Sequence, residues 1–471
     1  MSEKQIQTKN PMGHEPVGKL LARFAVPAII GNLVSAIYNI TDQIFIGQGV
    51  GMMGNAATSV AFPITTICTA IALLFGIGGA ASFNLEMGRG NHDKAKKIVG
   101  STFGCLFLSG IAIFAVIRVF LHPLLELFGA TDQIMEYAVS YVSITNFGIP
   151  FLLISTGGSN LVRSDGKPAY SMISILVGAV LNMVLDPIFI FVFHWGVAGA
   201  AAATTISQIV SSIMIISYLP RFRSVKIVPR DLIPKLTCVK AILSLGVSSF
   251  INQIASFTLQ IAMNSTLRHY GALSAYGSEI PLAAMGIISK INMIIISVVL
   301  GIAQGGQPIL GYNYGARQYL RVRKTFRYIL TSALAFSCVA FLCFQLFPGT
   351  FIGLFGTGDE LYLRFATRLL RIYMFFTFLN CCQPIASTVF TAIGKPLKGA
   401  GISLTRQILF LMPLVVLLPR FLGIDGVVYA GPIADLVAFA FAASMLAYEF
   451  WRMPRENEPM KTSRIKETEA V

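Results

Sequence analysis

Four polar side chains that could together bind a small cation lie within apolar stretches of this 471-residue sequence. Asp42 and Asp186 stand inside long apolar segments, and Asn182 and Thr204 lie close to Asp186 along the chain. Asn182 and Asp186 are four residues apart and therefore share one face of a helix. Oxygen ligands suit hard cations, and two neighbouring carboxylates can also share a proton because both are not easily ionised away from water. If their helices converge, the residues predict a site for H⁺ or Na⁺.

A plainer interpretation of the two acids requires no bound cation. Asp42 falls late in its apolar segment and could reach the membrane interface, and Asp186 could cap a helix before Pro187. Ionisable groups at membrane depth are nevertheless costly, which makes each of them a functional hypothesis. Both interpretations stay open on spacing alone.

The segments that carry these residues are long enough to cross a bilayer. Hydrophobic residues make up 55% of the chain and charged residues 12%, against about 25% charged in soluble domains, and the mean hydropathy is +0.71. A span needs about 20 apolar residues, and on that basis we expect about twelve spanning helices. They are placed near residues 20–47, 56–85, 95–121, 133–159, 168–194, 197–219, 241–269, 281–310, 321–347, 362–391, 396–421 and 427–450.

Positive charge predicts which side each connection faces. Lys and Arg collect at both ends of the chain and in alternate connections, at 89–97, 163–167, 221–240, 317–327 and 395–398. The intervening connections, 48–56, 195–196, 271–280 and 348–361, contain neither residue. The positive-inside rule then predicts a multi-pass protein of the inner (cytoplasmic) membrane with both termini cytoplasmic. The net charge of +15 follows from this topology rather than from nucleic-acid binding, and the basic loops could contact anionic membrane lipids.

Two motifs occur twice and indicate a duplication. Gly166-Lys167-Pro168 is repeated at Gly394-Lys395-Pro396 (394 − 166 = 228), and a glycine-rich run from Gly76 to Gly90 is repeated from Gly301 to Gly315 (301 − 76 = 225). Six spans return a chain to its starting side, so the halves should be related by a pseudo-two-fold axis along the membrane normal. We expect an N-terminal arm at 1–19, lobes at 20–219 and 241–450, a basic linker at 220–240 and a tail at 451–471.

Over nearly its whole length the chain resembles the multidrug and toxic compound extrusion (MATE) family. The resemblance lies in Phe24–Gly31, in Gly76–Lys97 with its copy Gly301–Lys324, and in the two G-K-P turns. It implies an all-α fold of twelve helices in two six-helix lobes, and cation-coupled export of amphipathic, often cationic, drugs by alternating access. It implies no enzyme activity and no cofactor besides the transported H⁺ or Na⁺.

The resemblance also assigns residues. In the DinF-type and MepA-like prokaryotic branch, the N-terminal lobe holds a cation site that maps here onto Asp42, Asn182, Asp186 and Thr204. Pro27 matches a proline of the first helix that is linked to bending during transport, and a proline inside a helix favours a kink.

The C-terminal lobe departs from the NorM-like branch, which holds acids on helices 7 and 10. Helix 7 here offers only amides, and helix 10 offers Arg368 and Arg371 instead of an acid; the amides are Asn252, Gln253, Gln260 and Asn264. We expect Asp435 to form a structural ion pair with Arg406, and Arg163 to act as a cytoplasmic anchor.

Two other classes of function remain as alternatives. A flippase of lipids or lipid-linked oligosaccharides would have the same architecture, but it would need a strongly cationic central cavity, and the basic residues here lie mostly in the loops. A membrane enzyme would need a catalytic motif such as H-E-x-x-H or G-x-S-x-G, and the sequence contains neither. An exporter of small amphipathic or cationic drugs, acting as a monomer, is the function that the sequence favours.

Overall fold

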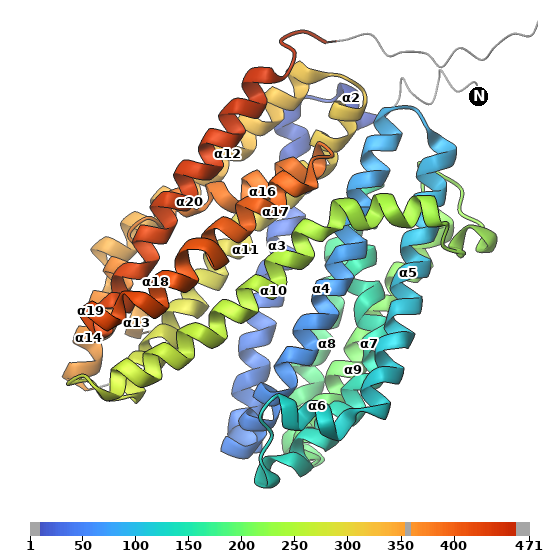
Figure 1. The fold of residues 1–471 in the computed structure, drawn as a ribbon. Helices are drawn as coiled ribbons and strands as arrows, with labels where there is room; N and C mark the ends of the chain where they lie inside the picture. The colour runs from blue at the N-terminus through green and yellow to red at the C-terminus, as the bar shows by residue number, and fades with distance from the viewer. Residues whose placement is uncertain (1–9, 354–358, 458–471) are drawn as a thin grey trace, which may run out of the picture.

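All regular secondary structure is helical in the part that the computed structural model describes, residues 10–353 and 359–457. Parts of the predicted terminal arms, 1–19 and 451–471, lie outside these residues. The helices form two bundles that diverge away from the end where the described part of the chain begins and finishes (Figure 1). We call this the basic end, because it also carries the loops at 89–97 and 395–398.

The first half of the chain forms the N-terminal bundle. Its helices are α2 (Pro11–His14), α3 (Val17–Gly49), α4 (Met52–Gly88), α5 (His92–Val119), α6 (Leu121–Leu127), α7 (Asp132–Ser164), α8 (Pro168–Pro187), which continues as a π-helical turn (Ile188–Val192), and α9 (Gly196–Tyr218). Two short 3₁₀ turns, Leu219–Arg221 and Pro229–Leu232, lie in the connection to the second half.

The second half forms the C-terminal bundle. Its helices are α10 (Leu236–Ala272), α11 (Glu279–Gly315), α12 (Tyr319–Leu346), α13 (Pro348–Gly353), α14 (Glu360–Tyr373), α15 (Thr377–Asn380), α16 (Cys382–Ala392), α17 (Pro396–Leu404) with a π-helical turn (Thr405–Leu411), α18 (Met412–Leu417), α19 (Pro419–Leu422) and α20 (Ile424–Arg452).

The number of spans confirms the sequence prediction of about twelve. Among the described residues, 11 helices are long and apolar enough to cross a membrane, or 12 if one bent pair is counted as a span. That pair, α14 with Thr377–Ala392, is bent by 48°, so the continuous helix predicted at 362–391 is wrong. The bend lies at residues 374–376, between α14 and Thr377. Pro384 accounts for a separate interruption at Cys381, because proline has no N–H to bond the carbonyl of Asn380 and its ring clashes with that group.

The two G-K-P turns have the same conformation. Gly166 and Gly394 adopt φ values of 87° and 81°, which favour glycine because a Cβ would collide with the backbone. Pro168 and Pro396 each begin the following helix, where the missing N–H has no partner to lose. The 228-residue equivalence predicted for these turns is therefore confirmed.

The second repeat is shifted from the predicted register. The turn after α4 has Gly90 at a φ of 80°, and the turn after α11 has Arg317 at a φ of 57°, so the structural offset is 317 − 90 = 227. The predicted match of Gly90 with Gly315 is wrong by two residues. A left-handed residue other than glycine costs about 1–2 kcal/mol, and the second copy places an arginine there, so matching glycines misaligned the repeat.

The bundles meet closely through glycines on α4 and α10. A Cβ on Gly78 would lie 2.1 Å from the carbonyl oxygen of Ile242, and one on Gly246 would lie 1.7 Å from the carbonyl oxygen of Leu74. Only glycine permits backbones to approach so closely, as in membrane helix pairs that use small residues.

A second glycine contact is reciprocal and lies nearer the basic end. A Cβ on Gly88 would lie 2.1 Å from the carbonyl oxygen of Tyr312, and one on Gly315 would lie 2.3 Å from that of Leu85. Gly88 and Gly315 are 227 residues apart in the sequence, and so are Leu85 and Tyr312. Each half thus gives the same two positions to the contact, as expected for two surfaces related by a two-fold axis. The bundles are therefore closed at the basic end.

Candidate cation site

The four residues predicted to bind a cation lie together inside the N-terminal bundle. Asn182 and Asp186 lie on α8 and are 1% and 0% exposed, and Thr204 lies on the adjacent α9. In the amide orientation that satisfies both ends of Asn182, its Nδ2 donates to Asp186 Oδ2 at 2.7 Å. Its oxygen then accepts from the backbone N–H and the hydroxyl of Thr204, both at 3.2 Å. Asn182 therefore joins α8 to α9.

Asp42 completes the group from α3. Its carboxyl group interacts directly with that of Asp186, and its Oδ1 is buried without a hydrogen-bond partner among the described residues. Asp42 is only 8% exposed, so its carboxyl group is enclosed by the bundle. Asp186 is bonded to Asn182, and the helix continues past Pro187, so Asp186 is not an isolated cap. The burial of both acids favours the interpretation as a cation site, which stays a prediction.

Two tyrosines border the site, and the sequence interpretation did not include them. Tyr38 and Tyr141 both lie near the hydroxyl of Thr204 and within electrostatic reach of Asp42 and Asp186. Tyr38 precedes Asp42 by four residues and so lies on the same helix face, which is a signal that could have identified it. Tyr141 lies on α7, and no spacing in the sequence connects it with the acids.

Pro27 lies on α3 between two residues that pack tightly against the other bundle. A Cβ on Gly301 would lie 2.6 Å from Cα of Ile29, and one on Gly305 would lie 2.5 Å from Cα of Ala25. The helix passes through Pro27 without interruption. Any change in the bend at Pro27 would therefore move the contact between α3 and α11.

The C-terminal bundle has no matching pair of carboxylates among its described residues. Arg406 Nε lies 2.8 Å from Asp435 Oδ1 inside the bundle, which confirms the predicted ion pair. Next to it, Gln407 donates to Asn252 Oδ1 at 3.0 Å and to Ser256 Oγ at 2.8 Å. This region therefore offers an ion pair and neutral hydrogen-bonding groups. Its acid, Asp435, is already neutralised by Arg406.

Arg163 differs from its predicted role. It was expected to be a cytoplasmic anchor, but α7 extends past it and the side chain is only 7% exposed. Its Nη1 donates to Oε1 of Gln304 on α11 at 2.9 Å. The guanidinium therefore connects the two bundles instead of facing the solvent.

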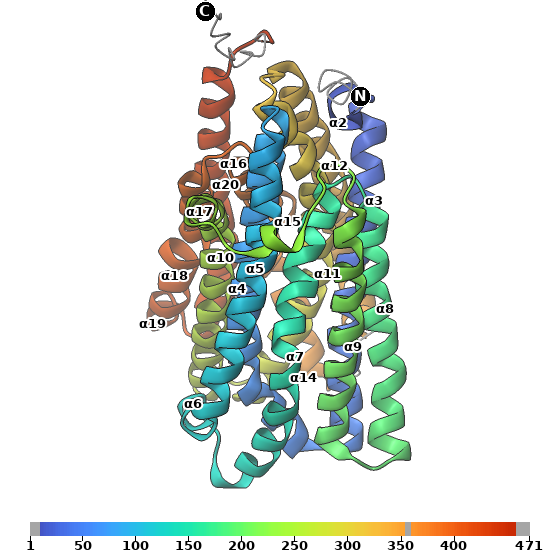
Figure 2. The same cartoon turned by 90° about the vertical axis from the view of Figure 1, so that its right-hand side faces the viewer.

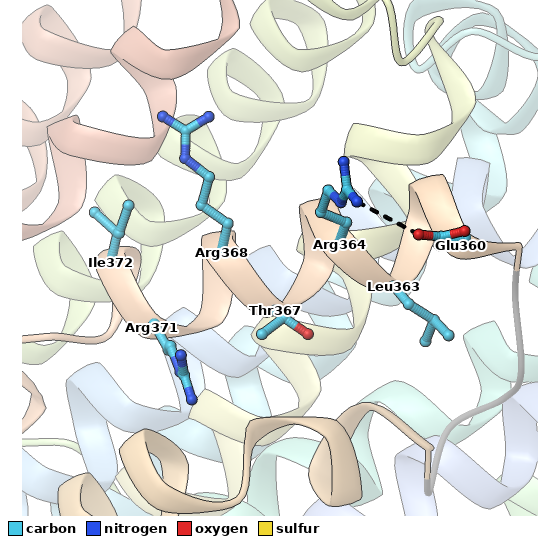
Figure 3. Close-up of a pocket in the computed structure, with 7 residues that line it drawn as sticks. All are labelled: Glu360, Leu363, Arg364, Thr367, Arg368, Arg371 and Ile372. Atoms are coloured by element: carbon cyan, nitrogen blue, oxygen red, sulfur yellow. Dashed lines mark hydrogen bonds and ion pairs between the residues drawn. The ribbon is translucent and has the colours of Figure 1, made fainter.

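A surface cavity along α14 is cationic and unsuited to binding a cation (Figure 3). Its volume is about 510 Å³, and it is lined by Glu360, Leu363, Arg364, Thr367, Arg368, Arg371 and Ile372. Glu360 is the one acid among these residues and lies 3.4 Å from Arg364, and Arg368 lies 3.0 Å from Asp425.

Comparisons with known proteins agree with this architecture. The family model MatE matches residues 27–188 and 245–417. The multidrug export protein MepA of Staphylococcus aureus is 26% identical over 437 residues, which cover 92% of this chain and 94% of that protein. The MATE multidrug transporter DinF-BH, solved in complex with a ligand, is 34% identical, with a TM-score of 0.85 over 93% of this chain and 97% of that one. A MATE structure in the straight conformation is 24% identical, with a TM-score of 0.87 over 94% and 98%.

Proposed function

The chain belongs to the MatE family of membrane transporters, and from this premise we propose that it exports amphipathic, often cationic, drugs in exchange for H⁺ or Na⁺. The observation that carries the proposal is the pair of interacting carboxylates, Asp42 and Asp186, buried inside the N-terminal bundle. The relatives support the drug substrates, because one is a multidrug export protein and another is a multidrug transporter solved with a ligand.

The proposed site distinguishes a cation by charge and by oxygen ligands. Two carboxylates in a site that excludes most water repel each other, and one bound proton or Na⁺ removes that repulsion. Asn182 holds Asp186 in place by its amide, and the Thr204 hydroxyl faces the same amide. Oxygens of Asp42, Asn182, Asp186 and Thr204 could surround Na⁺, whereas the carboxylate pair alone is sufficient for H⁺. The geometry suits both ions, so the coupling ion is decided by experiment.

The exchange requires that the drug and the cation exclude each other, and the N-terminal bundle is where the cation acts. In the conformation described, the bundles are closed at the basic end, which the positive-inside rule makes cytoplasmic, so the drug leaves and the cation enters from outside. Cation binding neutralises Asp42 on α3, and α3 carries Pro27 and the contact with α11. The change at Asp42 is thereby transmitted to the interface between bundles. An inward-directed potential contributes about 2.3 kcal/mol per charge per 100 mV.

Dye efflux from proteoliposomes tests the proposal, with a Na⁺ gradient and a proton gradient applied separately. We expect one gradient to drive efflux in the wild-type protein and neither to do so in Asp42→Asn or Asp186→Asn. Asp93→Asn is the matched control, because Asp93 is an exposed acid in the first turn of α5. Each variant is first shown to be folded by size-exclusion chromatography and thermal unfolding.

The outcomes separate the alternatives. Wild-type rates in folded Asp42→Asn and Asp186→Asn proteins would refute the role of the acid pair. Absence of efflux with either ion in folded wild-type protein would instead favour the lipid flippase, which a lipid-scrambling assay on the same vesicles would detect.

A further inference from the structure

The connection between the bundles is fixed along the N-terminal bundle. We call residues 219–240 the strap. Near its start, the Asp165 carboxylate accepts hydrogen bonds from the Tyr218 hydroxyl at 2.8 Å, the Arg223 N–H at 2.8 Å and the Ser224 N–H at 3.0 Å. Asp165 is 5% exposed. One buried carboxylate thus joins the end of α9 to two backbone N–H groups of the strap, so the strap is not a loose linker.

The strap is attached a second time, to α5. A Cβ on Gly100 would lie 2.1 Å from the carbonyl oxygen of Asp231, and one on Gly104 would lie 2.0 Å from that of Leu232. The two glycines therefore form a shallow track in which the strap backbone lies. Lys96 Nζ, from the same helix, lies 3.1 Å from Asp231 Oδ2.

This attachment lies well below the basic end of α5. The helix begins at His92, and a rise of about 1.5 Å per residue places Gly100 and Gly104 roughly 12 and 18 Å along it. The strap crosses the outer face of the N-terminal bundle, as the view turned by 90° shows (Figure 2). Because α5 is a candidate membrane span, a segment on its outer face lies where the surrounding bilayer can reach it.

The strap carries positive charge without internal neutralisation. Its six basic residues are all exposed, and none has a carboxylate within 4.0 Å in the described part of the chain; they are Arg221, Arg223, Lys226, Arg230, Lys235 and Lys240. Asp231, the one acid in the strap, already accepts a hydrogen bond from the Val228 N–H and pairs with Lys96. Burial by itself raises the pKa of Asp231, but the Val228 N–H and the Lys96 ammonium hold it below its ordinary value. Asp231 is therefore already held by Val228 and Lys96, and of the six cations only Lys235 adds to the lowering of its pKa.

Large apolar side chains stand exposed among these charges. Val228 is 46% exposed, Ile233 is 65% and Leu236 is 71%. Exposed apolar groups interleaved with Lys and Arg are typical of segments that lie in a membrane interface, with the apolar groups below the head groups. Nucleic acid would not explain the apolar groups, and lipid tails alone would not explain the charges.

We propose that the strap is a binding surface for anionic phospholipids of the leaflet at the basic end. Ile233 and Leu236 enter the acyl region, and the exposed Lys and Arg side chains contact the phosphates. The strap follows the N-terminal bundle, so bound lipid anchors that bundle in the leaflet while the C-terminal bundle moves against it. This proposal stands whether or not the protein exports drugs.

Native mass spectrometry of the full-length protein titrated with phosphatidylglycerol or phosphatidylcholine tests the proposal. We expect phosphatidylglycerol to bind more tightly, and Lys226→Gln/Arg230→Gln to lose about thirtyfold in that affinity, since each interfacial cation contributes about fivefold. The loss should shrink at high salt, because salt screens exposed charges. Ile233→Asn/Leu236→Asn should weaken both lipids.

The matched control removes two charges elsewhere at the basic end. Lys324 and Arg327 are exposed on α12, and Lys324→Gln/Arg327→Gln should change phosphatidylglycerol affinity far less than the strap variant. An equal loss in both variants would show a general charge effect and would overturn the strap as the site. So would equal affinity of the wild-type protein for the two lipids.

Discussion

At the residue scale, the hydroxyl of Thr204 tests whether the oxygen cluster binds a cation. Thr204→Val keeps the shape of the side chain and removes the oxygen that faces Asn182. An interaction with a charged group is worth about 1.5–3 kcal/mol, so the apparent affinity for Na⁺ should fall about tenfold or more, whereas the apparent affinity for H⁺ should stay nearly unchanged. The measurement is the cation concentration that gives half-maximal dye efflux.

Thr205→Val is the control for this substitution. Thr205 is equally buried at 8% exposure on the same helix, but its hydroxyl donates to backbone carbonyls of Ala201 and Ile144. It should leave the cation dependence unchanged. Equal shifts in both variants would mean that Thr204 acts only through packing of α9.

Asp435 allows a contrasting prediction for a buried acid with a structural role. Asp435→Asn leaves the Arg406 guanidinium buried and unpaired, which should cost about 3–5 kcal/mol of stability. Thermal unfolding should show the loss, while the Na⁺ or H⁺ dependence of efflux in the remaining folded protein should stay as in the wild type. A changed coupling ratio would assign Asp435 to the cation pathway.

The sequence predicted these residues unevenly, for a physical reason. Asp42, Asn182, Asp186 and Thr204 could be predicted because buried polar groups are rare in spans and two of them share a helix face. Tyr141 could not, because a tyrosine in a membrane helix is ordinary and only the packing of α7 against α9 brings it to the site.

At the element scale, the reciprocal glycine contact between α4 and α11 should control closure of the basic end. Gly88→Val would place side-chain atoms against the carbonyl oxygen of Tyr312, which is 2.1 Å from the Cβ position. The bundles should separate there, and the population with the basic end open should rise. Distances between spin labels on Lys97→Cys and Lys324→Cys, measured by electron paramagnetic resonance, report that separation.

Two glycine controls make the measurement specific. Gly286→Ala, on α11, meets nothing within 4 Å and should have no effect. Gly157→Ala would clash with Leu106 and the carbonyl of Ala72 within the N-terminal bundle, so it should lower stability without changing the distance between bundles. An unchanged label distance in Gly88→Val would contradict the closing role of this contact.

The helices and turns show what patterns in the sequence can and cannot predict. Apolar length was enough to predict about twelve spans, and the G-K-P turns were matched correctly because both need a left-handed glycine. The register of the other repeat was missed, since Arg317 adopts the left-handed conformation that Gly90 adopts in the first copy. The bend at residues 374–376 and the interruption at Cys381 were missed as well. Proline is tolerated in many membrane helices, so Pro384 did not predict the interruption.

At the scale of the whole molecule, the two bundles share a fold but differ in charge. The N-terminal bundle encloses Asp42 and Asp186, whereas in the described part of the C-terminal bundle the buried Asp435 is paired with Arg406. Duplication therefore kept the turns and the contacts on the two-fold axis and changed the interior chemistry. Under the proposed function, this asymmetry gives each transporter one cation site and not two.

A single site with two carboxylates that share one cation predicts the charge moved per cycle. Exchange of one cation for one monovalent cationic drug moves no net charge, so the membrane potential should not change the driving force for that drug. Export of an uncharged drug by the same cycle moves one charge inward and should gain about 2.3 kcal/mol per 100 mV. Proteoliposomes clamped with potassium and valinomycin allow efflux of the two kinds of drug to be compared at set potentials. Acceleration of the monovalent drug by an inside-negative potential would require more than one cation per cycle, and hence a second cation site or separate protonation of Asp42 and Asp186.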